Sequence, residues 1–120
     1  MLVGWEINFT AVFGAWWNDL PVEEQVAVER RVVLLAEGGP NLGRPTVDTI
    51  ASSHANMKEL RVGAGGAIRV LFAFDPRREA ILLLGGSKSG AWNEWYRSNV
   101  PIADDLFDAY LQDLRDEGLI

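Results

Sequence analysis

The chain contains no cysteine, only one histidine and no hydrophobic run long enough to cross a membrane. Without cysteine it can have no disulfide framework, no thiolate nucleophile and no cysteine-based zinc site. The lone histidine has no second histidine or cysteine with which to share a metal, so we predict no metal site. The N-terminal stretch lacks a basic segment followed by a long apolar core. We therefore expect a cytoplasmic protein that is neither exported nor membrane-spanning.

The length and hydrophobic content predict a single folded domain. With 120 residues, of which 48% are hydrophobic, the chain can bury a core without help from a metal or a disulfide. No linker or internal repeat divides it, so the domain should span residues 1–120.

Positive charge is concentrated in one stretch of an acidic chain. The net charge is −6, yet residues 58–88 hold six lysines and arginines against three acidic residues, a local charge of +3. A basic surface on an acidic protein indicates a site for phosphate or carboxylate groups, since the overall charge would repel such ligands. The alternative is that these cations only keep strand edges solvated.

Apolar spacing predicts the secondary structure. A period of two or a short apolar run predicts strands over residues 5–10, 57–62, 67–75 and 79–84, and short turns make the last three an antiparallel meander. Helical spacing predicts helices over residues 11–20, 22–37 and 92–98, and a last one from Pro101. Residues 41–56 should form a loop with a helical turn at 49–52, and residues 85–90 another loop. The second helix should bury Val26, Ala27, Arg30, Val33 and Leu34.

These elements predict an α+β fold. An N-terminal strand and a helical hairpin should pack on a small antiparallel sheet, followed by a C-terminal helix with an acidic outer face.

Two glycine-rich segments do not meet the requirements of nucleotide-binding loops. The segment GGSKSG at residues 85–90 would need a glycine six positions before its lysine, where the chain has Leu82. The segment VGAGGA at residues 62–67 joins two predicted strands and opens no helix, which excludes a dinucleotide site. The serines lack a recognisable histidine and carboxylate partner, and His54, in a polar loop, is expected to be exposed rather than catalytic.

What remains is a set of cations on the predicted sheet. Strand alternation puts Arg61 and Arg69 on one face, and counting across the hairpin places Arg61 opposite Ile68 or Arg69. Lys88 follows the next strand in a glycine-flanked loop, from which its ammonium group could reach the same surface. Three cations around one point suit the negative charge of a phosphoryl-transfer transition state.

Nearly the whole chain resembles one family. The segments MKELR at residues 57–61, RVLFAFDP at 69–76, AILLLGGSKSG at 80–90 and WNEWY at 92–96 are similar to the HigB-like, phage Gp49-like branch of the RelE/ParE toxin superfamily. The resemblance implies a RelE-like fold and the toxin half of a type II toxin–antitoxin pair, neutralised by a cognate helix-turn-helix antitoxin. It also implies a metal-independent and cofactor-independent endoribonuclease that cleaves mRNA, commonly on the ribosome, and so inhibits translation. The RNA's own 2′-hydroxyl would attack the phosphodiester.

The resemblance further implies roles for individual residues. Arg61 and Arg69 match the family's strand arginines and Lys88 its basic residue after the last strand, so these three are the expected catalytic residues. The expected RNA-binding residues are Lys58, Arg77, Arg78, Trp92 and Tyr96. The alternatives are solvated or glutamate-paired arginines and, for the two aromatics, packing in the core, which their helical spacing favours.

Two other functions stay open on the same fold. One is a ParE-like inhibitor of DNA gyrase, which would not need the three-cation cluster, and the other is a non-catalytic interaction module. The acidic first and last thirds of the chain would oppose docking on ribosomal RNA and would suit a partner with basic patches, such as an antitoxin.

Overall fold

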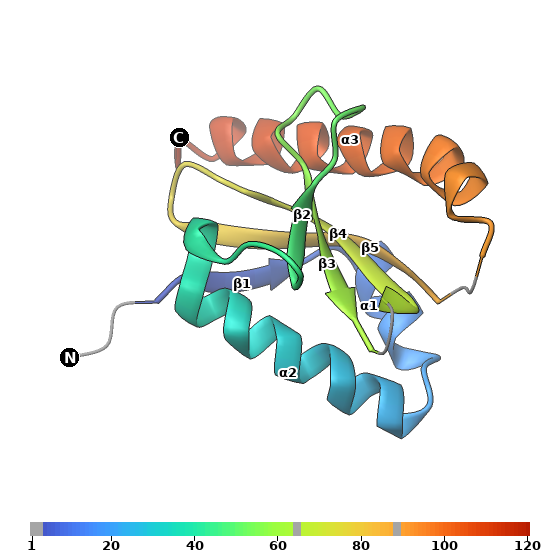
Figure 1. Cartoon of the computed structure of the whole chain (residues 1–120). Coiled ribbons are helices and arrows are strands. Elements are labelled where there is room, and N and C mark those ends of the chain that lie inside the picture. Colours follow the sequence, from blue (N-terminus) through green and yellow to red (C-terminus); the bar gives the residue numbers. More distant parts are fainter. Residues whose placement is uncertain (1–3, 64–65, 88–89) are drawn as a thin grey trace.

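A five-stranded sheet with helices on both faces forms the domain (Figure 1). The computed structural model describes residues 4–63, 66–87 and 90–120. The elements in chain order are β1 (Glu6–Phe9), α1 (Ala11–Asn18), α2 (Val22–Gly38), the short 3-10 helix η1 (Gly39–Asn41), β2 (Val47–Thr49), β3 (Lys58–Val62), β4 (Ile68–Phe74), β5 (Glu79–Ser87) and α3 (Trp92–Asp116).

The central part of the sheet is the predicted meander. Strands β3, β4 and β5 pair antiparallel in sequence order, which confirms the prediction from alternation and short turns. The full order is β1-β5-β4-β3-β2, and β1 pairs with β5 in parallel, so the sheet is mixed and not purely antiparallel. Within residues 41–56, the loop prediction is wrong for Val47–Thr49, which form the edge strand β2 paired antiparallel with β3. The turn predicted at 49–52 lies one residue later, where the Ser53 amide donates a hydrogen bond to the Ile50 carbonyl, and it is not part of a helix.

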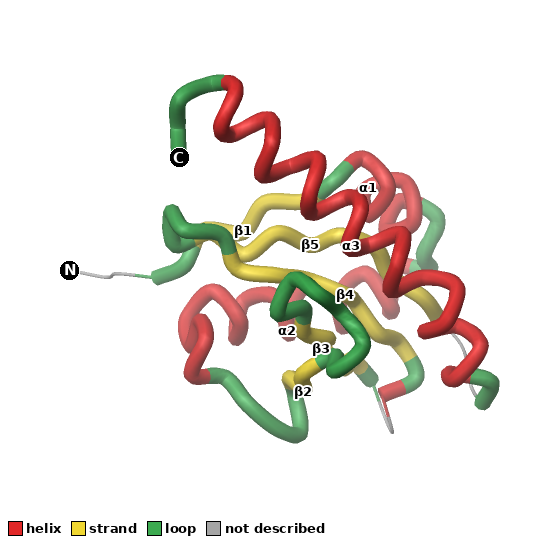
Figure 2. The backbone as a smooth tube through the Cα atoms, turned by 90° about the horizontal axis from the view of Figure 1, so that it is seen from above, coloured by secondary structure: helices red, strands yellow, loops and turns green. Residues whose placement is uncertain are grey.

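Helices α1 and α2 cover one face of the sheet and α3 covers the other. The first face buries Phe13 and Leu35 against strand residues such as Phe72. The second buries Trp95 and Phe107 against the strand residues of opposite parity. Figure 1 shows α3 above the sheet and α2 below it, and Figure 2 shows α3 lying over the strands when the molecule is seen from above. Among the described residues, no helix is both long and apolar enough to cross a bilayer.

The C-terminal part differs from the sequence prediction because α3 is one continuous helix. A short helix followed by a second one from Pro101 was expected, but Pro101 lies inside α3. Proline leaves the carbonyl four residues earlier without its helical donor, which normally favours a break or kink. Here Trp95 and Val100 before the proline and Phe107 after it are buried in the same cluster, so packing on the sheet keeps the helix continuous across the proline.

The glycines at residues 85 and 86 belong to β5 and not to a loop. A Cβ on Gly85 would lie 2.5 Å from the Trp16 ring on one face, and a Cβ on Gly86 would lie 2.4 Å from the Trp95 indole on the other. Two tryptophans therefore pack directly on the strand backbone from opposite sides. This close approach requires glycine at both positions and explains the pair without any phosphate-binding role.

Most of the buried face of α2 is displaced by one residue from the predicted stripe, although Ala27 packs against the core as predicted. Val28 and Leu35 are buried, whereas Val26, Val33 and Leu34 are 41–52% exposed and Arg30 is exposed. The helix carries apolar residues on more than one face, so several helical stripes fit its sequence and only contact with the sheet selects one.

Candidate active site

Two arginines face each other across adjacent strands at one end of the sheet. Arg61 on β3 is the direct partner of Arg69 on β4, which settles the predicted register in favour of Arg69 and places both side chains on the face covered by α3. Their side chains are 34% and 14% exposed, respectively. Without an anion between them, two guanidinium groups so placed would repel each other.

Glu59 supplies that anion. Its side chain is only 2% exposed, and one carboxylate oxygen accepts a hydrogen bond of 2.8 Å from Nε of Arg61 and forms an ion pair of 2.8 Å with Nη2 of the same guanidinium. The other oxygen lies 3.9 Å from Nη1 of Arg69. The hydrogen bond to Glu59 raises the pKa of Arg61, which stays fully charged. The cluster is therefore a buried carboxylate held between two cations.

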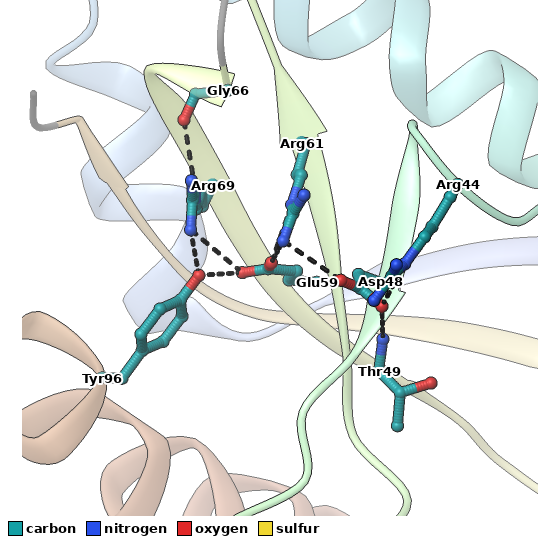
Figure 3. A network of polar contacts seen from close by, with 8 residues as sticks. All are labelled: Arg44, Asp48, Thr49, Glu59, Arg61, Gly66, Arg69 and Tyr96. Carbon is teal, nitrogen blue, oxygen red and sulfur yellow. Dashed lines mark hydrogen bonds and ion pairs between the residues drawn. The ribbon is translucent and has the colours of Figure 1, made fainter. Parts of the chain in front are cut away.

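Tyr96 closes the cluster from α3. Its hydroxyl donates a hydrogen bond to Glu59 and accepts one from Nη1 of Arg69 (Figure 3). Burial raises the pKa of Tyr96, and the hydrogen bond to Glu59 raises it further, so the hydroxyl keeps its proton at neutral pH. The Arg69 guanidinium also lies 4.3 Å from the centre of the Trp92 ring and 5.7 Å from that of Tyr96. Both aromatics thus hold Arg69 in place, and Tyr96 links helix and sheet.

Asp48 extends the row of charges to the sheet edge. Its carboxylate lies 3.1 Å from Nη2 of Arg61 and 3.1 Å from Nε of Arg44. The hydrogen bond from Arg44 is the main cause that lowers the pKa of Asp48. Figure 3 shows the resulting alternation of Arg69, Glu59, Arg61, Asp48 and Arg44. With three arginines and two carboxylates, the row has a net charge of +1.

A hollow of about 340 Å³ opens beside this row. It is bounded by Glu59, Arg61 and Tyr96 on one side and by the end of β2 and its following loop on the other; its lining residues are Asp48, Thr49, Ile50, Ala51, Ser52, Glu59, Arg61 and Tyr96. A group bound there would contact the carboxylate, a guanidinium and the tyrosine together.

The other residues predicted from the sequence lie elsewhere. Strand alternation places Lys58 on the opposite face of β3 from Arg61. Arg77 and Arg78 lie in the turn between β4 and β5, at the far end of β4 from Arg69. Lys88 lies outside the described residues.

The two turn arginines already have protein partners. Arg77 lies 2.9 Å from Glu79 and donates a hydrogen bond of 3.2 Å to the Tyr110 hydroxyl. Tyr110 in turn donates to Asp75, whose side chain is fully buried. The Arg78 guanidinium lies 4.8 Å from the centre of the Trp5 ring. The structure thus gives both arginines structural contacts, and their assignment to RNA binding stays a prediction.

The histidine is held by the acidic face of α3. His54 is 61% exposed, with Nε2 3.1 Å from Asp108 and Nδ1 3.4 Å from Asp104. The hydrogen bond with Asp108 is the main cause that raises the pKa of His54, and the charge of Asp104 adds to it. In residues 4–63, 66–87 and 90–120, no cluster of histidine and acidic residues could hold a metal ion.

Three members of the charged row, Glu59, Asp48 and Arg44, had no predicted role in the site. Glu59 alternates with Leu60 and so shares the face of Arg61, a pattern that could have identified it as the partner of the arginines. Asp48 was assigned to a loop, and only its pairing in β2 opposite Glu59 brings it to Arg61. No local pattern indicates that pairing.

The comparison with known families identifies the chain. The family model described as "Phage derived protein Gp49-like (DUF891)" matches residues 15–108, which is most of the chain. The chain belongs to the Gp49-like family.

Two relatives of this Gp49-like protein come from Mycobacterium tuberculosis. The chain is 50% identical over 97 residues to "Putative toxin HigB3", covering 80% of its own length and 84% of the relative. It is 44% identical over 117 residues to "Putative toxin HigB2", covering 95% of its own length but only 58% of that relative. These matches confirm the predicted HigB-like branch.

Solved structures confirm the RelE-like fold of this Gp49-like protein. The toxin–antitoxin complex RelBE2 of Mycobacterium tuberculosis contains a chain that superposes with a TM-score of 0.59 at 17% identity, covering 72% of this chain and all of that one. The isolated RelE toxin of E. coli gives a TM-score of 0.59 at 10% identity, covering 78% and 96%. At such low identity the likeness concerns the fold alone.

Proposed function

We propose that this Gp49-like protein is the toxin half of a type II toxin–antitoxin pair and acts in the cytoplasm as a metal-independent endoribonuclease. Its substrate would be mRNA, on the ribosome, and cleavage would inhibit translation. The observation that carries the proposal is the cluster of Arg61, Arg69, Glu59 and Tyr96 beside an open hollow. The relatives named as HigB toxins support the same class of function.

The cluster contains the groups that an internal transesterification of RNA requires. A phosphate in the hollow would compete with Glu59 for the guanidinium groups, because its oxygens accept the same paired hydrogen bonds. The Glu59 carboxylate, partly released from Arg61, could then take the proton of the 2′-hydroxyl. The new bond from O2′ to phosphorus forms as the bond from phosphorus to O5′ breaks, giving a 2′,3′-cyclic phosphate.

The arginines would act on the transition state. Extra negative charge develops on the phosphate oxygens while both bonds are partial, and Arg61 and Arg69 are fixed by Glu59, Tyr96 and Trp92 before the substrate arrives. Lys88 is the residue that we assign to the leaving O5′, either to stabilise it or to give it a proton. The proposed reaction uses no metal, because the nucleophile is the 2′-hydroxyl of the RNA itself and cationic side chains balance the negative charge of the transition state.

Expression of the chain followed by mapping of RNA 5′ ends tests this function. Wild type should arrest growth and create new ends within messages, and the triple change of Arg61, Arg69 and Lys88 to alanine should abolish both. Each cationic or hydrogen-bonding group of this kind contributes about 10²–10³ in rate. Arg115→Ala, which removes one exposed cation from the end of α3, is the control and should stay active.

Four outcomes would contradict the ribonuclease. One is growth arrest without new 5′ ends, and another is cleavage that survives in a folded triple variant. The third is DNA damage with loss of supercoiling, which would favour a ParE-like gyrase inhibitor. Normal growth under strong expression of a folded chain would favour a non-catalytic interaction module.

The antitoxin is part of the proposal. We infer a helix-turn-helix partner, encoded beside this chain, whose basic residues meet the acidic surface that residues outside 58–88 provide. Solved complexes of RelE toxins with RelB antitoxins, which share this fold, support an antitoxin partner. Co-expression of the neighbouring reading frame should restore growth, and failure to do so would exclude that frame as the antitoxin.

A further inference from the structure

Three separate hollows that share wall residues lie next to one another at the Arg61 cluster, and we call them together the groove. The central hollow shares Arg61 with a second one of about 390 Å³, which is lined by Arg31, Pro45, Arg61, Gly63 and Gly66. It shares Ser52 and Tyr96 with a third one of about 550 Å³, which lies between α3 and the loop that follows β2. Because each outer hollow shares wall residues with the central one, the two outer hollows lie directly beside the cluster.

Arg31 lies at one end of this groove. It comes from α2, is half-buried, and its Nη1 donates a hydrogen bond of 3.1 Å to the Thr46 hydroxyl. The backbone carbonyl of Thr46 accepts a hydrogen bond from the Arg61 amide at 2.7 Å, so Thr46 fixes Arg31 close to Arg61. Among the described residues no carboxylate pairs with Arg31, so its charge is available to a ligand.

Arg97 lies on the other side of the cluster. It follows Tyr96 on α3, lines the third hollow and is exposed. Within the part of the chain that the structure describes, Arg97 makes no ion pair and no side-chain hydrogen bond, whereas Arg44, Arg61 and Arg69 all have acidic partners. Arg31 and Arg97, which have no acidic partner among the described residues, therefore flank the paired arginines of the cluster.

We propose that Arg31 and Arg97 bind the phosphates on either side of the scissile phosphate, so that single-stranded RNA follows the groove past Arg61 and Tyr96. This inference rests on the proposed ribonuclease function. Both residues are binding residues and not catalytic ones, because a phosphate at either would lie outside the Glu59 cluster.

The charge of the third hollow limits where that phosphate lies. Its far end holds Asp105 and the buried Asp104, which is engaged by Ser53 and His54. These acids repel phosphate, so the phosphate belongs at the Arg97 end. The carboxylates at the acidic end accept hydrogen bonds and donate none, so they suit hydrogen-bond donors such as the amino and imino groups of a base.

RNA binding by matched variants tests the groove. The probe is single-stranded RNA with 2′-methoxy groups, which can be bound but not cleaved, presented free and on programmed ribosomes. Arg31→Gln and Arg97→Gln should each weaken binding about tenfold, as expected for one charge-assisted contact. The slope of log affinity against log salt should fall by about 0.7 for each variant. In cleavage assays KM should rise while kcat stays within about threefold.

Two exposed arginines outside the groove provide controls of equal charge change. Arg30→Gln sits next to Arg31 on α2, and Arg115→Gln lies near the end of α3, so both should bind RNA as wild type does. If the control variants lose as much RNA affinity, the effect comes from net charge alone and the proposed binding along the groove is refuted. If wild type cleaves RNA and the Arg31 and Arg97 variants bind it unchanged, the groove is wrong while the ribonuclease stands. If wild type neither binds nor cleaves RNA in either presentation, the proposed function fails and the groove with it.

Discussion

Glu59 should be a main source of stability at the cluster, and Glu59→Gln tests this directly. Glutamine keeps the shape of the side chain but removes the negative charge between Arg61 and Arg69. The two guanidinium groups, directly opposite each other across β3 and β4, would then be neighbours of like charge without an anion. Tyr96 would also lose its charged acceptor.

The size of the effect follows from burial. Removing one partner of a fully buried ion pair costs about 3–5 kcal/mol of stability. Arg69 is close to that limit at 14% exposure, but Arg61 is 34% exposed and solvent screens part of its charge. We therefore expect a loss of about 2–3 kcal/mol in the free energy of unfolding. For a 120-residue chain this corresponds to a fall in Tm of about 8–12 °C.

Thermal unfolding of four variants completes the test. Glu29→Gln, on an exposed part of α2, is the control and should change stability by less than about 0.5 kcal/mol. In an Arg69→Gln background, Glu59→Gln should cost at least about 1 kcal/mol less than in wild type, because one of the uncompensated cations is gone. An unchanged Tm for Glu59→Gln, or an equal cost in both backgrounds, would refute the electrostatic account.

Two further predictions concern packing and pH. Gly86→Ala should lower the free energy of unfolding by about 1–3 kcal/mol, because its Cβ would lie 2.4 Å from the Trp95 indole, whereas Gly43→Ala meets no atom within 4 Å; urea midpoints that shift equally would contradict this. The pKa of His54 is raised, chiefly by its hydrogen bond with Asp108, so its stabilising effect is complete below the ordinary pKa of about 6.5 and is lost as pH rises through the raised value. Wild type should therefore lose Tm relative to His54→Gln as pH rises above about 6.5, and parallel Tm curves would disprove the link.

Local patterns correctly predicted the part of the fold that carries the arginines. A period of two and a short glycine-rich turn are properties of neighbouring residues, so the β3–β4 hairpin and the shared face of Arg61 and Arg69 could be derived from them. The helices α1 and α2 were likewise predicted to within about two residues, because a proline and a glycine mark their boundaries.

Local patterns gave the wrong prediction where tertiary packing opposed the local preference of a residue. Pro101 predicts a helix break by its own chemistry, but the buried residues on both sides of it keep α3 continuous. Glycines 85 and 86 are typical of a loop, but tryptophans from two helices need a strand without side chains at that point. In both cases packing outweighs the preference of the residue.

The sequence by itself determined that a pair of arginines would lie on one face of a hairpin, because strand alternation and a tight turn leave few other arrangements. Only the tertiary structure decided what surrounds that pair. Tyr96 reaches Glu59 from 37 residues away, β2 brings Asp48 to Arg61, and α2 brings Arg31 to the same groove. These contacts depend on how helices pack on the sheet and on which strand takes each edge, and no local pattern encodes either.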